Sequence, residues 1–205
     1  MSVERGTEAL LMRRREILAQ GAEPLGWKVG FNVPEIQQKL GIDKPLAGFL
    51  TTDSLVEGDW DDYPVVVESE VAVELGDDGR SITALLPALE IADPPDLELG
   101  LEQILAGNIF HRAVAFGPRV ETAEPGAGRI VVNGETQHEL TAQETSRNLT
   151  AMIEAVAERL EAGGEQLQPG ERIITGVLAP PYRAQPGDSV RLELEALGSV
   201  ELRFS

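Results

Sequence analysis

The sequence predicts an α+β fold in which helices pack against a folded sheet. Extended segments dominate the middle and the end of the chain, whereas amphipathic helical patterns stand at its start and before its last extended segments. Strands that are grouped, rather than alternated with helices, are typical of this class. The 205 residues, 42% of them hydrophobic, suit one domain with a real core. We therefore expect a single domain over 1–205, with an N-terminal helical arm at 1–24 and a core at 25–205.

Two helices and a short strand are expected in the first part of the chain. The first helix ends near Gly21, and its apolar face is formed by Leu10, Leu11, Ile17 and Leu18. The segment GWKVGF at 26–31 has the composition of a short strand. The second helix is expected at 32–41, where Asn32 can cap the N-terminus and Gly41 can end the helix.

Two strands, a helix and a hairpin are predicted in the middle of the chain. Residues 65–75 show the alternation of a strand, with valines opposite glutamates. Residues 85–92 are almost entirely apolar, which indicates a buried strand. A short helix is expected at 97–106. Within 129–140, the dipeptide Asn133-Gly134 between two extended runs is a strong hairpin signal.

The clearest helical pattern covers 144–162 and is followed by Gly163. Its apolar face comprises Leu149, Met152, Ile153, Val156 and Leu160. The rest of the chain predicts strands. At 168–175 and 185–192 a Pro-Gly turn precedes an extended run, and 198–204 forms a last strand.

Charge and composition exclude several classes of function. A net charge of −18 repels phosphate backbones, so we expect no nucleic-acid partner. No apolar run approaches the ~20 residues that span a bilayer. The first residues do not resemble a signal peptide, so we expect a cytoplasmic protein without a membrane partner. Because the chain has no cysteine and 2 histidines, a metal site would consist mostly of oxygen ligands, which favours Mg²⁺ or Mn²⁺ over zinc.

Glu68, Glu70 and Glu90 are the candidate metal ligands. Strand side chains alternate between faces, so Glu68 and Glu70 point the same way, roughly 7 Å apart. They are either the solvated face of an ordinary strand or a pair of carboxylates aimed at one cation. Glu90 favours the cation, because it lies in an apolar run where an unpaired buried carboxylate costs several kcal/mol. The alternatives for Glu90 are a carboxylate that reaches solvent and one that pairs with an arginine.

Lys28 and His111 are candidates for a catalytic role. Lys28 lies among aromatic residues and glycines, where a ligand can approach the backbone closely. It is either a surface lysine with its stem on Trp27 or a group that steadies negative charge or moves a proton. His111, next to Arg112, is either structural or contacts an anionic substrate. The sequence has neither a phosphate-binding glycine motif nor a Gly-x-Ser-x-Gly elbow.

Six segments follow one another in an order that is quite specific as a set. They are GWKVGFNVPEIQQKLGIDKPLAGFL, VESEVAVEL, PALEIAD, the Asn133-Gly134 hairpin, ITGVLAPPYRAQPGD and LGSVELRF. From about Leu25 to the C-terminus, the chain resembles the 2-keto-4-pentenoate hydratase and 4-oxalocrotonate decarboxylase branch of the fumarylacetoacetate hydrolase superfamily. The resemblance implies the mixed β-roll of the fumarylacetoacetase C-terminal domain, with packed helices.

The resemblance also implies a site and its partners. The family's Glu-x-Glu pair falls on Glu68 and Glu70, its third ligand for Mg²⁺ or Mn²⁺ on Glu90, and its lysine on Lys28. The matching segments supply the candidate substrate-binding residues Gly30, Leu50, Asn108, Arg112, Thr175 and Gly176. The implied substrate is a small 2-oxo acid that chelates the metal. Family members usually form homo-oligomers, and some associate with a partner enzyme of the same pathway.

One segment departs from the family's pattern and leaves three functions open. Where members carry an Ala-Asp-Asn-x-Ser-like segment, this chain has Ala106-Gly107-Asn108-Ile109-Phe110-His111. Of the polar residues of that pattern, Asn108 alone matches, and His111 is the candidate to replace the lost polar group. The first function is a metal-dependent lyase that hydrates or decarboxylates a 2-oxo or 2-hydroxydienoic acid. The second is an acylpyruvate-type C–C hydrolase or an oxaloacetate-type tautomerase. The third is a weakly active homologue that binds a ligand or pairs with an active subunit.

Overall fold

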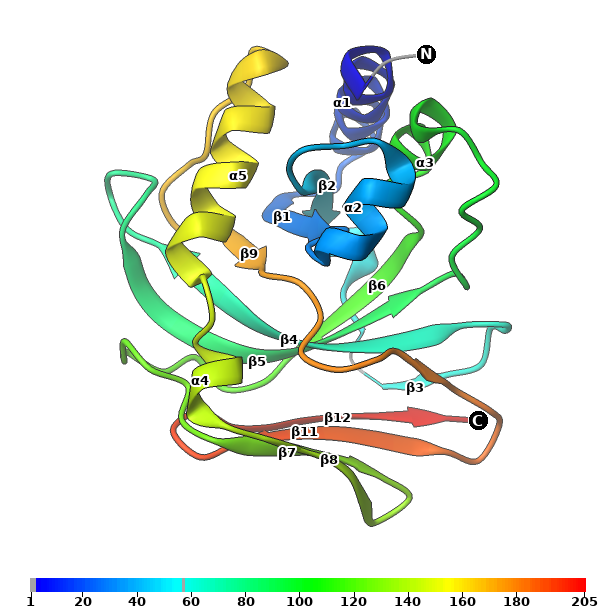
Figure 1. Cartoon of the computed structure of the whole chain (residues 1–205), viewed down its shortest axis with the longest axis vertical. Helices are drawn as coiled ribbons and strands as arrows, with labels where there is room; N and C mark the ends of the chain where they lie inside the picture. Colours follow the sequence, from blue (N-terminus) through cyan, green and yellow to red (C-terminus); the bar gives the residue numbers. More distant parts are fainter. Residues whose placement is uncertain (1–2, 57) are drawn as a thin grey trace.

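Two β-sheets and several helices form the chain in the computed structural model, which describes residues 3–56 and 58–205 (Figure 1). The helices are α1 (Val3–Ala19), α2 (Pro34–Leu40), α3 (Leu101–Ala106), α4 (Ala142–Thr145) and α5 (Leu149–Ala162), with a 3₁₀ turn η1 (Thr52–Ser54). The first six strands are β1 (Pro24–Gly30), β2 (Leu46–Thr51), β3 (Asp59–Trp60), β4 (Val66–Leu75), β5 (Ile82–Ala92) and β6 (His111–Phe116). The others are β7 (Gly128–Val132), β8 (Glu135–Leu140), β9 (Arg172–Ile174), β10 (Tyr182–Arg183), β11 (Ser189–Leu194) and β12 (Gly198–Phe204). The predicted α+β class is confirmed.

The two sheets form separate layers. In the described part of the chain, the larger sheet has the order β2-β1-β9-β4-β5-β6, with β10 paired to β4, and the smaller sheet has the order β3-β12-β11-β7-β8. Most pairs are antiparallel, but β1 and β9 run parallel, as do β12 and β3. Figure 1 shows α1, α2, α3 and α5 on one side of the larger sheet and the smaller sheet on its other side.

The main core lies between the two sheets and continues under the helices. Val67, Val71 and Val73 of β4 belong to the same buried cluster as Leu192 of β11 and Leu202 of β12. These valines occupy one face of β4, so the alternation in the sequence sorts apolar side chains toward the core. The other face of β4 presents different side chains, including Glu68 and Glu70.

A second, smaller apolar cluster shows that the larger sheet curls into a roll. It brings together Leu50, Ala72, Leu86, Ala88, Val114 and Ile174. Leu50 comes from β2 and Val114 from β6, which stand at opposite ends of the strand order. The two edges share one cluster because the sheet bends around it. This interior of the roll faces the side of β4 that carries Glu68 and Glu70.

Several predicted boundaries need correction. The second helix begins at Pro34, with Val33 at the N-cap and no side-chain cap, so the prediction that Asn32 caps it is wrong. Gly41 ends this helix in the left-handed conformation, as predicted. The helix expected at 97–106 is limited to α3. The helix expected at 144–162 is interrupted at Asn148, whose φ of 59° lies in the left-handed region.

The sequence did not predict four strands, namely β2, β3, β6 and β10. β3 and β10 have two residues each, which is too short for any periodicity. β2 (LAGFLT) is buried at every position, so no alternation marks it. β6 follows directly on the segment that departs from the family pattern, and its strand character depends on pairing with β5. Whether such segments form strands depends more on pairing with neighbouring strands than on local propensity.

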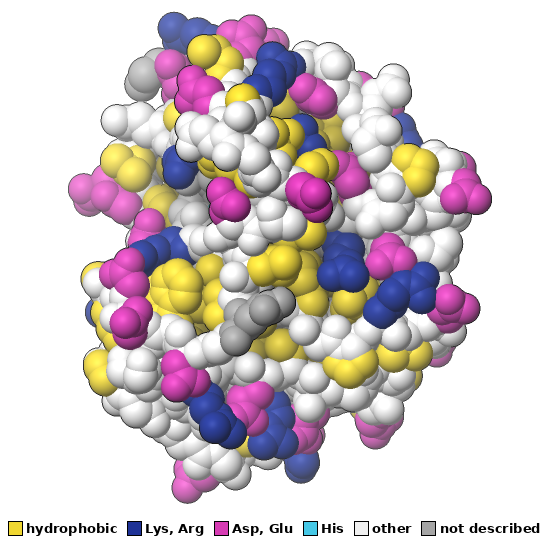
Figure 2. Space-filling model, turned by 180° about the vertical axis from the view of Figure 1, so that it is seen from behind, with side chains coloured by type: hydrophobic (Ala, Val, Ile, Leu, Met, Phe, Trp, Pro, Cys, Tyr) yellow, Lys and Arg dark blue, Asp and Glu magenta, His cyan; other side chains and the backbone are white. Residues whose placement is uncertain are grey.

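The N-terminal helix packs tightly on the rest of the chain. Leu10 and Leu11 of α1 belong to the main core cluster. Arg14 lies 4.6 Å from the ring centre of Trp27 and 3.6 Å from Oε1 of Glu171. The Trp27 indole donates a hydrogen bond of 3.0 Å to the other carboxylate oxygen of Glu171, Oε2. Among the described residues, no helix is both long and apolar enough to cross a membrane. Figure 2 shows acidic and basic side chains interspersed on one face of the molecule.

Candidate functional site

Three glutamates from two adjacent strands converge in the interior of the roll. Glu68 of β4 stands directly opposite Glu90 of β5 in the antiparallel register. Glu70 lies two residues along β4 and therefore on the same face. One carboxylate oxygen from each residue lies within 4.8 Å of the others. The structure thus brings the predicted acidic triad together, next to the apolar cluster that fills the roll.

Burial makes this concentration of acid unfavourable unless positive charge is added. The side chains of Glu70 and Glu90 are both inaccessible to solvent. Burial, and then the neighbouring charge of Glu90, raise the pKa of Glu68 to about 7. Burial likewise raises the pKa of Glu70 well above its ordinary range, and the charges of Glu90 and Glu68 add to the effect. Two of the three carboxyl groups therefore resist ionisation without a further cation.

Lys28 supplies one positive charge to this cluster. It projects from β1 into the roll, is 2% exposed, and forms an ion pair with Glu90. Its ammonium group also donates a hydrogen bond of 3.2 Å to the carbonyl oxygen of Ile109. Burial alone would lower the pKa of Lys28, but the charges of Glu90, Glu68 and Glu70 raise it. The alternative of a surface lysine lying on Trp27 is wrong, because Trp27 points into the main core instead.

His111 fixes Glu90 from the start of β6. Its Nδ1 lies 2.8 Å from Oε1 of Glu90, the same oxygen that pairs with Lys28. Burial lowers the pKa of His111, so the ring is neutral and Nδ1 carries the proton that it donates. Burial would raise the pKa of Glu90, but the charge of Lys28 and the hydrogen bond from His111 lower it. Glu90 is therefore the ionised member of the cluster.

The remaining carboxylate oxygens have the properties of cation ligands. Oε2 of Glu70 accepts a hydrogen bond of 2.6 Å from the backbone N–H of Gly176. Oε1 of Glu70 and Oε2 of Glu90 are buried and have no hydrogen-bond partner among the described residues. A buried carboxylate oxygen without a donor needs a cation to offset its desolvation. Oxygen donors of this kind suit Mg²⁺ or Mn²⁺, so the residues fit the implied metal.

An unusual turn before β6 positions two of these groups. Asn108, Ile109 and Phe110 all have left-handed φ values, of 59°, 52° and 63°. This conformation is strained for a β-branched residue such as Ile109, and strain of this kind clusters at functional sites. The side chain of Asn108 holds the turn in place, because it accepts from the N–H of Phe49 at 2.8 Å and donates to its carbonyl at 3.0 Å. The turn thereby directs the Ile109 carbonyl at Lys28.

A cavity of about 230 Å³ opens beside the cluster. Lys28 and Glu68 line it at the site, and we call it the site cavity. Its apolar wall includes Phe31, Val33, Ile36, Leu97, Phe110 and Val177. Because pockets for drug-sized ligands usually measure ~300–1,000 Å³, this volume suits a small acid. Sequence reasoning missed this wall, since its residues come from separate loops and turns with no shared motif.

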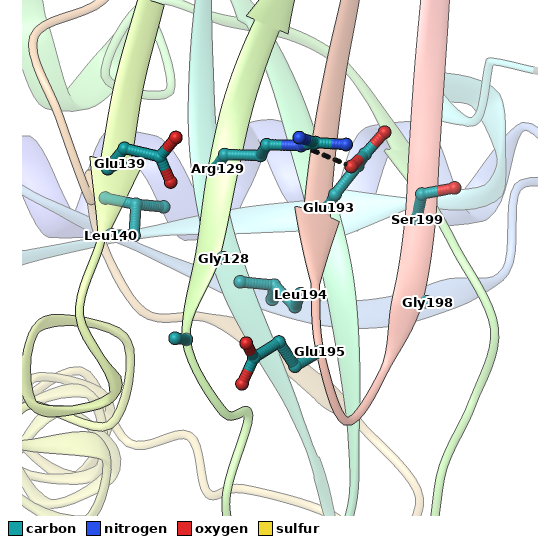
Figure 3. A pocket seen from close by; sticks show the side chains of 10 residues that line it. Gly128, Arg129, Glu139, Leu140, Glu193, Leu194, Glu195, Gly198 and Ser199 are labelled. Atoms are coloured by element: carbon teal, nitrogen blue, oxygen red, sulfur yellow. Dashed lines mark hydrogen bonds and ion pairs between the residues drawn. The ribbon is translucent and has the colours of Figure 1, made fainter. Parts of the chain in front are cut away.

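A larger hollow lies on the smaller sheet, but it has no comparable chemistry. It measures about 520 Å³ and is lined by strand residues such as Arg129 and Glu193 (Figure 3). Arg129 donates a hydrogen bond of 2.6 Å to Glu193, so these charges satisfy each other. No member of the acidic triad lines this hollow. We therefore assign the candidate site to the interior of the roll.

The predicted substrate-binding residues occupy different places. Gly30 lines the site cavity, and a Cβ there would come within 2.7 Å of Ile109 Cγ2. The hydroxyl of Thr175 donates to the carbonyl of Val71 at 2.8 Å, which ties this segment to β4 and helps to place Gly176 against Glu70. Gly30, Thr175 and Gly176 thus shape the site through the backbone.

Two predicted substrate-binding residues lie away from the cavity wall. Leu50 is fully buried in the apolar cluster inside the roll. Arg112 pairs with Asp62 and lies 3.5 Å from a carboxylate oxygen of Asp93. It therefore turns toward other acids rather than toward Lys28. Neither side chain is among those that line the site cavity.

Known proteins share this sequence pattern and this fold. Residues 47–205 match the model of the fumarylacetoacetate (FAA) hydrolase C-terminal family. A 4-oxalocrotonate decarboxylase from Pseudomonas sp is 28% identical, with 94% of this chain and 82% of the relative covered. The 2-keto-4-pentenoate hydratase 1 of Dechloromonas aromatica (strain RCB) is 26% identical, with coverages of 93% and 81%.

Solved structures bear out the expected fold. The 4-oxalocrotonate decarboxylase from Pseudomonas putida G7, complexed with magnesium and adipate, superposes with a TM-score of 0.86 at 22% identity and covers 100% of this chain and 87% of its own. Fumarylpyruvate hydrolase from Pseudomonas aeruginosa, in complex with Mn²⁺ and pyruvate, gives a TM-score of 0.60 at 15% identity, with coverages of 87% and 88%. At these identities the likeness shows the fold, and it confirms the predicted β-roll with packed helices.

Proposed function

Since the chain belongs to the fumarylacetoacetate hydrolase C-terminal family, we propose that it is a divalent-metal-dependent lyase that hydrates or decarboxylates a small 2-oxo or 2-hydroxydienoic acid. The observation that supports this most is the set of converging glutamates with unpartnered buried oxygens beside a protonated lysine. The named relatives include both decarboxylases and hydratases, and two of the solved relatives are complexes with calcium or magnesium.

Glu68, Glu70 and Glu90 would hold the metal, Mg²⁺ or Mn²⁺. When bound, the ion supplies positive charge that stabilises an enolate developing on a 2-oxo acid. The protein residues have separate tasks. Gly176 and His111 orient the carboxylates of Glu70 and Glu90. The apolar wall of the site cavity packs against the part of the substrate that points away from the metal.

Lys28 is the proton-handling group in this proposal. Its pKa is raised by the surrounding glutamates, so it is protonated at neutral pH. A protonated lysine at the site cavity can donate a proton to an enolate carbon or balance its charge. Its hydrogen bond to the Ile109 carbonyl restrains the ammonium group in this position.

Turnover by the metal-loaded protein tests the reaction. Protein stripped with EDTA is reloaded with Mg²⁺ or Mn²⁺ and incubated with 2-hydroxydienoates and acylpyruvates. Loss of dienol absorbance, release of CO₂ and product identity are recorded. Hydration or decarboxylation supports the lyase, whereas cleavage of an acylpyruvate alone replaces it with the hydrolase. Tight metal binding without any turnover supports the weakly active homologue and contradicts the proposal.

Substitution of the ligands tests the metal site independently of activity. Glu70→Gln and Glu90→Gln should each remove saturable binding of Mg²⁺ in calorimetry, because a neutral amide cannot replace a carboxylate charge in this buried position. Glu74→Gln is the matched control. Glu74 lies further along the same face of β4, where it pairs with Arg119 and Arg172. Retained Mg²⁺ affinity in both ligand variants, with native circular dichroism, would disprove the triad.

A further inference from the structure

The site cavity carries positive charge at its floor only. Lys28 is the sole basic residue among the described residues that line it. The acidic lining residues are Glu68, at the proposed metal, and Asp93, whose side chain is 56% exposed. The remaining wall away from the floor is dominated by aliphatic and aromatic side chains from the segment 31–36, the 108–110 turn, the loop before α3 and the segment after β9.

The neighbouring arginine is not available to a ligand in this cavity. Arg112 forms an ion pair with Asp62, approaches Asp93 at 3.5 Å and stacks over the ring of Trp60 at 5.2 Å. Its guanidinium group is therefore engaged by these neighbours, and its side chain does not line the site cavity. Lys28 likewise forms an ion pair with Glu90 and lies at the proposed reaction centre. A second anionic group on a substrate would find no free cation among the described residues along the wall.

We infer that the site accepts 2-oxo monocarboxylic acids with a short uncharged tail and discriminates against 2-oxo dicarboxylic acids, with Leu97 and Phe110 on the wall as specificity determinants. This inference rests on the proposed function for the metal and the 2-oxo acid end. It selects hydration over decarboxylation, because loss of CO₂ through an enolate requires a second carboxylate on the substrate. A carboxylate buried unpaired against an apolar wall loses its hydration without compensation. An alkyl tail instead gains about fourfold in affinity for each methylene group that the wall covers.

Two six-carbon acids that differ at one end test the inference. 2-Oxohexanoate ends in a methyl group and 2-oxoadipate in a second carboxylate. Binding of each to the Mg²⁺-loaded protein is measured by calorimetry in 0.15 M NaCl, with pyruvate as the tailless reference. We expect 2-oxohexanoate to bind at least tenfold more tightly than 2-oxoadipate and more tightly than pyruvate. Equal binding of the two acids, or a preference for 2-oxoadipate, overturns the inference.

A charge introduced on the wall tests the residue assignment. Leu97→Arg places a cation beside the tail of the substrate. It should tighten the binding of 2-oxoadipate at least tenfold and weaken the binding of 2-oxohexanoate. Leu99→Arg is the matched control, because Leu99 is equally exposed, at 37% against 38%, but does not line the site cavity. Both variants add the same charge to an acidic protein, so a general electrostatic effect would appear in both. Equal effects of the two variants contradict the role of Leu97.

The ligand series separates the two proposals. If pyruvate, 2-oxohexanoate and 2-oxoadipate all fail to bind in the presence of Mg²⁺, the proposed function fails and the inference on the tail falls with it. If the three acids bind with similar affinity, the proposed binding of a 2-oxo acid at the metal is supported. Only the preference for an uncharged tail is then overturned. The wild-type comparison decides this even where Leu97→Arg does not fold.

Discussion

At the scale of single residues, Glu90 connects the two nitrogen-bearing groups of the site, the ammonium of Lys28 and the ring of His111. Lys28 and His111 both contact its Oε1, whereas its Oε2 has no hydrogen-bond partner within residues 3–56 and 58–205. One oxygen is therefore saturated by the protein while the other remains for a cation. This arrangement explains why a glutamate is tolerated in an otherwise apolar strand. It also makes His111 a positioning residue for Glu90, whatever its part in proton transfer.

His111→Ala should weaken metal binding without abolishing it. The substitution removes the donor that holds Oε1 of Glu90 at 2.8 Å, and loss of such an orienting hydrogen bond typically costs ~10–100-fold in metal affinity. Calorimetric titration with Mg²⁺ measures the change. His138→Ala is the control, because His138 lies exposed on β8.

The same variant tests the predicted catalytic role of His111. If His111 moves a proton, His111→Ala should also change the pH profile of kcat at saturating Mg²⁺. An unchanged turnover and pH profile would leave His111 with a positioning role only. Metal affinity equal to that of the wild type would rule out that role as well.

At the scale of elements, the pair β4–β5 carries the site and the strained turn completes it. The residue pattern indicated both strands and the common face of Glu68 and Glu70, because a strand has a period of two. The turn at 108–110 could not be predicted in the same way. Its left-handed backbone depends on Asn108 binding Phe49 across a long sequence separation. The site therefore combines locally encoded strands with a turn that only tertiary contacts hold.

Hydrogen bonds to Asp188 join the smaller sheet to β10. Asp188 accepts hydrogen bonds from Asn133 at 2.8 Å, from the hydroxyl of Tyr182 at 2.9 Å and from the N–H of Gln185 at 2.8 Å. Burial would raise the pKa of Asp188, but these three donors lower it below its ordinary value of 3.8. The ionised carboxylate thus fastens the β7–β8 hairpin to the start of β11.

Asp188→Asn should lower the free energy of unfolding at neutral pH by about 1–3 kcal/mol, because hydrogen bonds to a charged acceptor are lost. A lowered folded pKa stabilises the native state above the unfolded pKa near 3.8, and this contribution disappears as the pH falls through the folded value. The difference between variant and wild type should therefore shrink below about pH 4. Urea denaturation at pH 7 and pH 3 measures it. A pH-independent difference, or an equal effect of the exposed Asp77→Asn, would contradict this account.

At the scale of the whole molecule, the net charge of −18 and the buried triad act in the same direction. Excess negative charge destabilises a compact state by self-repulsion, and any bound cation relieves it. A specific site adds more stability than general screening does. A ligand that binds only the native state stabilises it by an amount that increases with the logarithm of the ligand concentration above Kd. Separation of these two effects shows whether the triad is a true metal site.

Mg²⁺ should raise the melting temperature more than NaCl of equal ionic strength. At 100 times its dissociation constant, a ligand of the native state adds about 2.7 kcal/mol, which corresponds to roughly 5–10 °C for a chain of this size. Differential scanning fluorimetry measures the increment. Glu70→Gln should keep the increment from NaCl and lose the additional one from Mg²⁺. Equal Mg²⁺ increments in both proteins would indicate screening alone.

The sequence by itself determined the class of fold, the strands β4 and β5, and the residues of the acidic triad. Period-two alternation and the isolated Glu90 are local features that a sequence displays directly. The tertiary structure alone decided that Lys28 is buried rather than exposed, that His111 contacts Glu90, and that Arg112 turns away from the cavity. These outcomes depend on curling of the larger sheet, which brings β1, β6 and the 108–110 turn around β4 and β5. Contacts between strands so distant in the chain leave no periodic trace in the sequence.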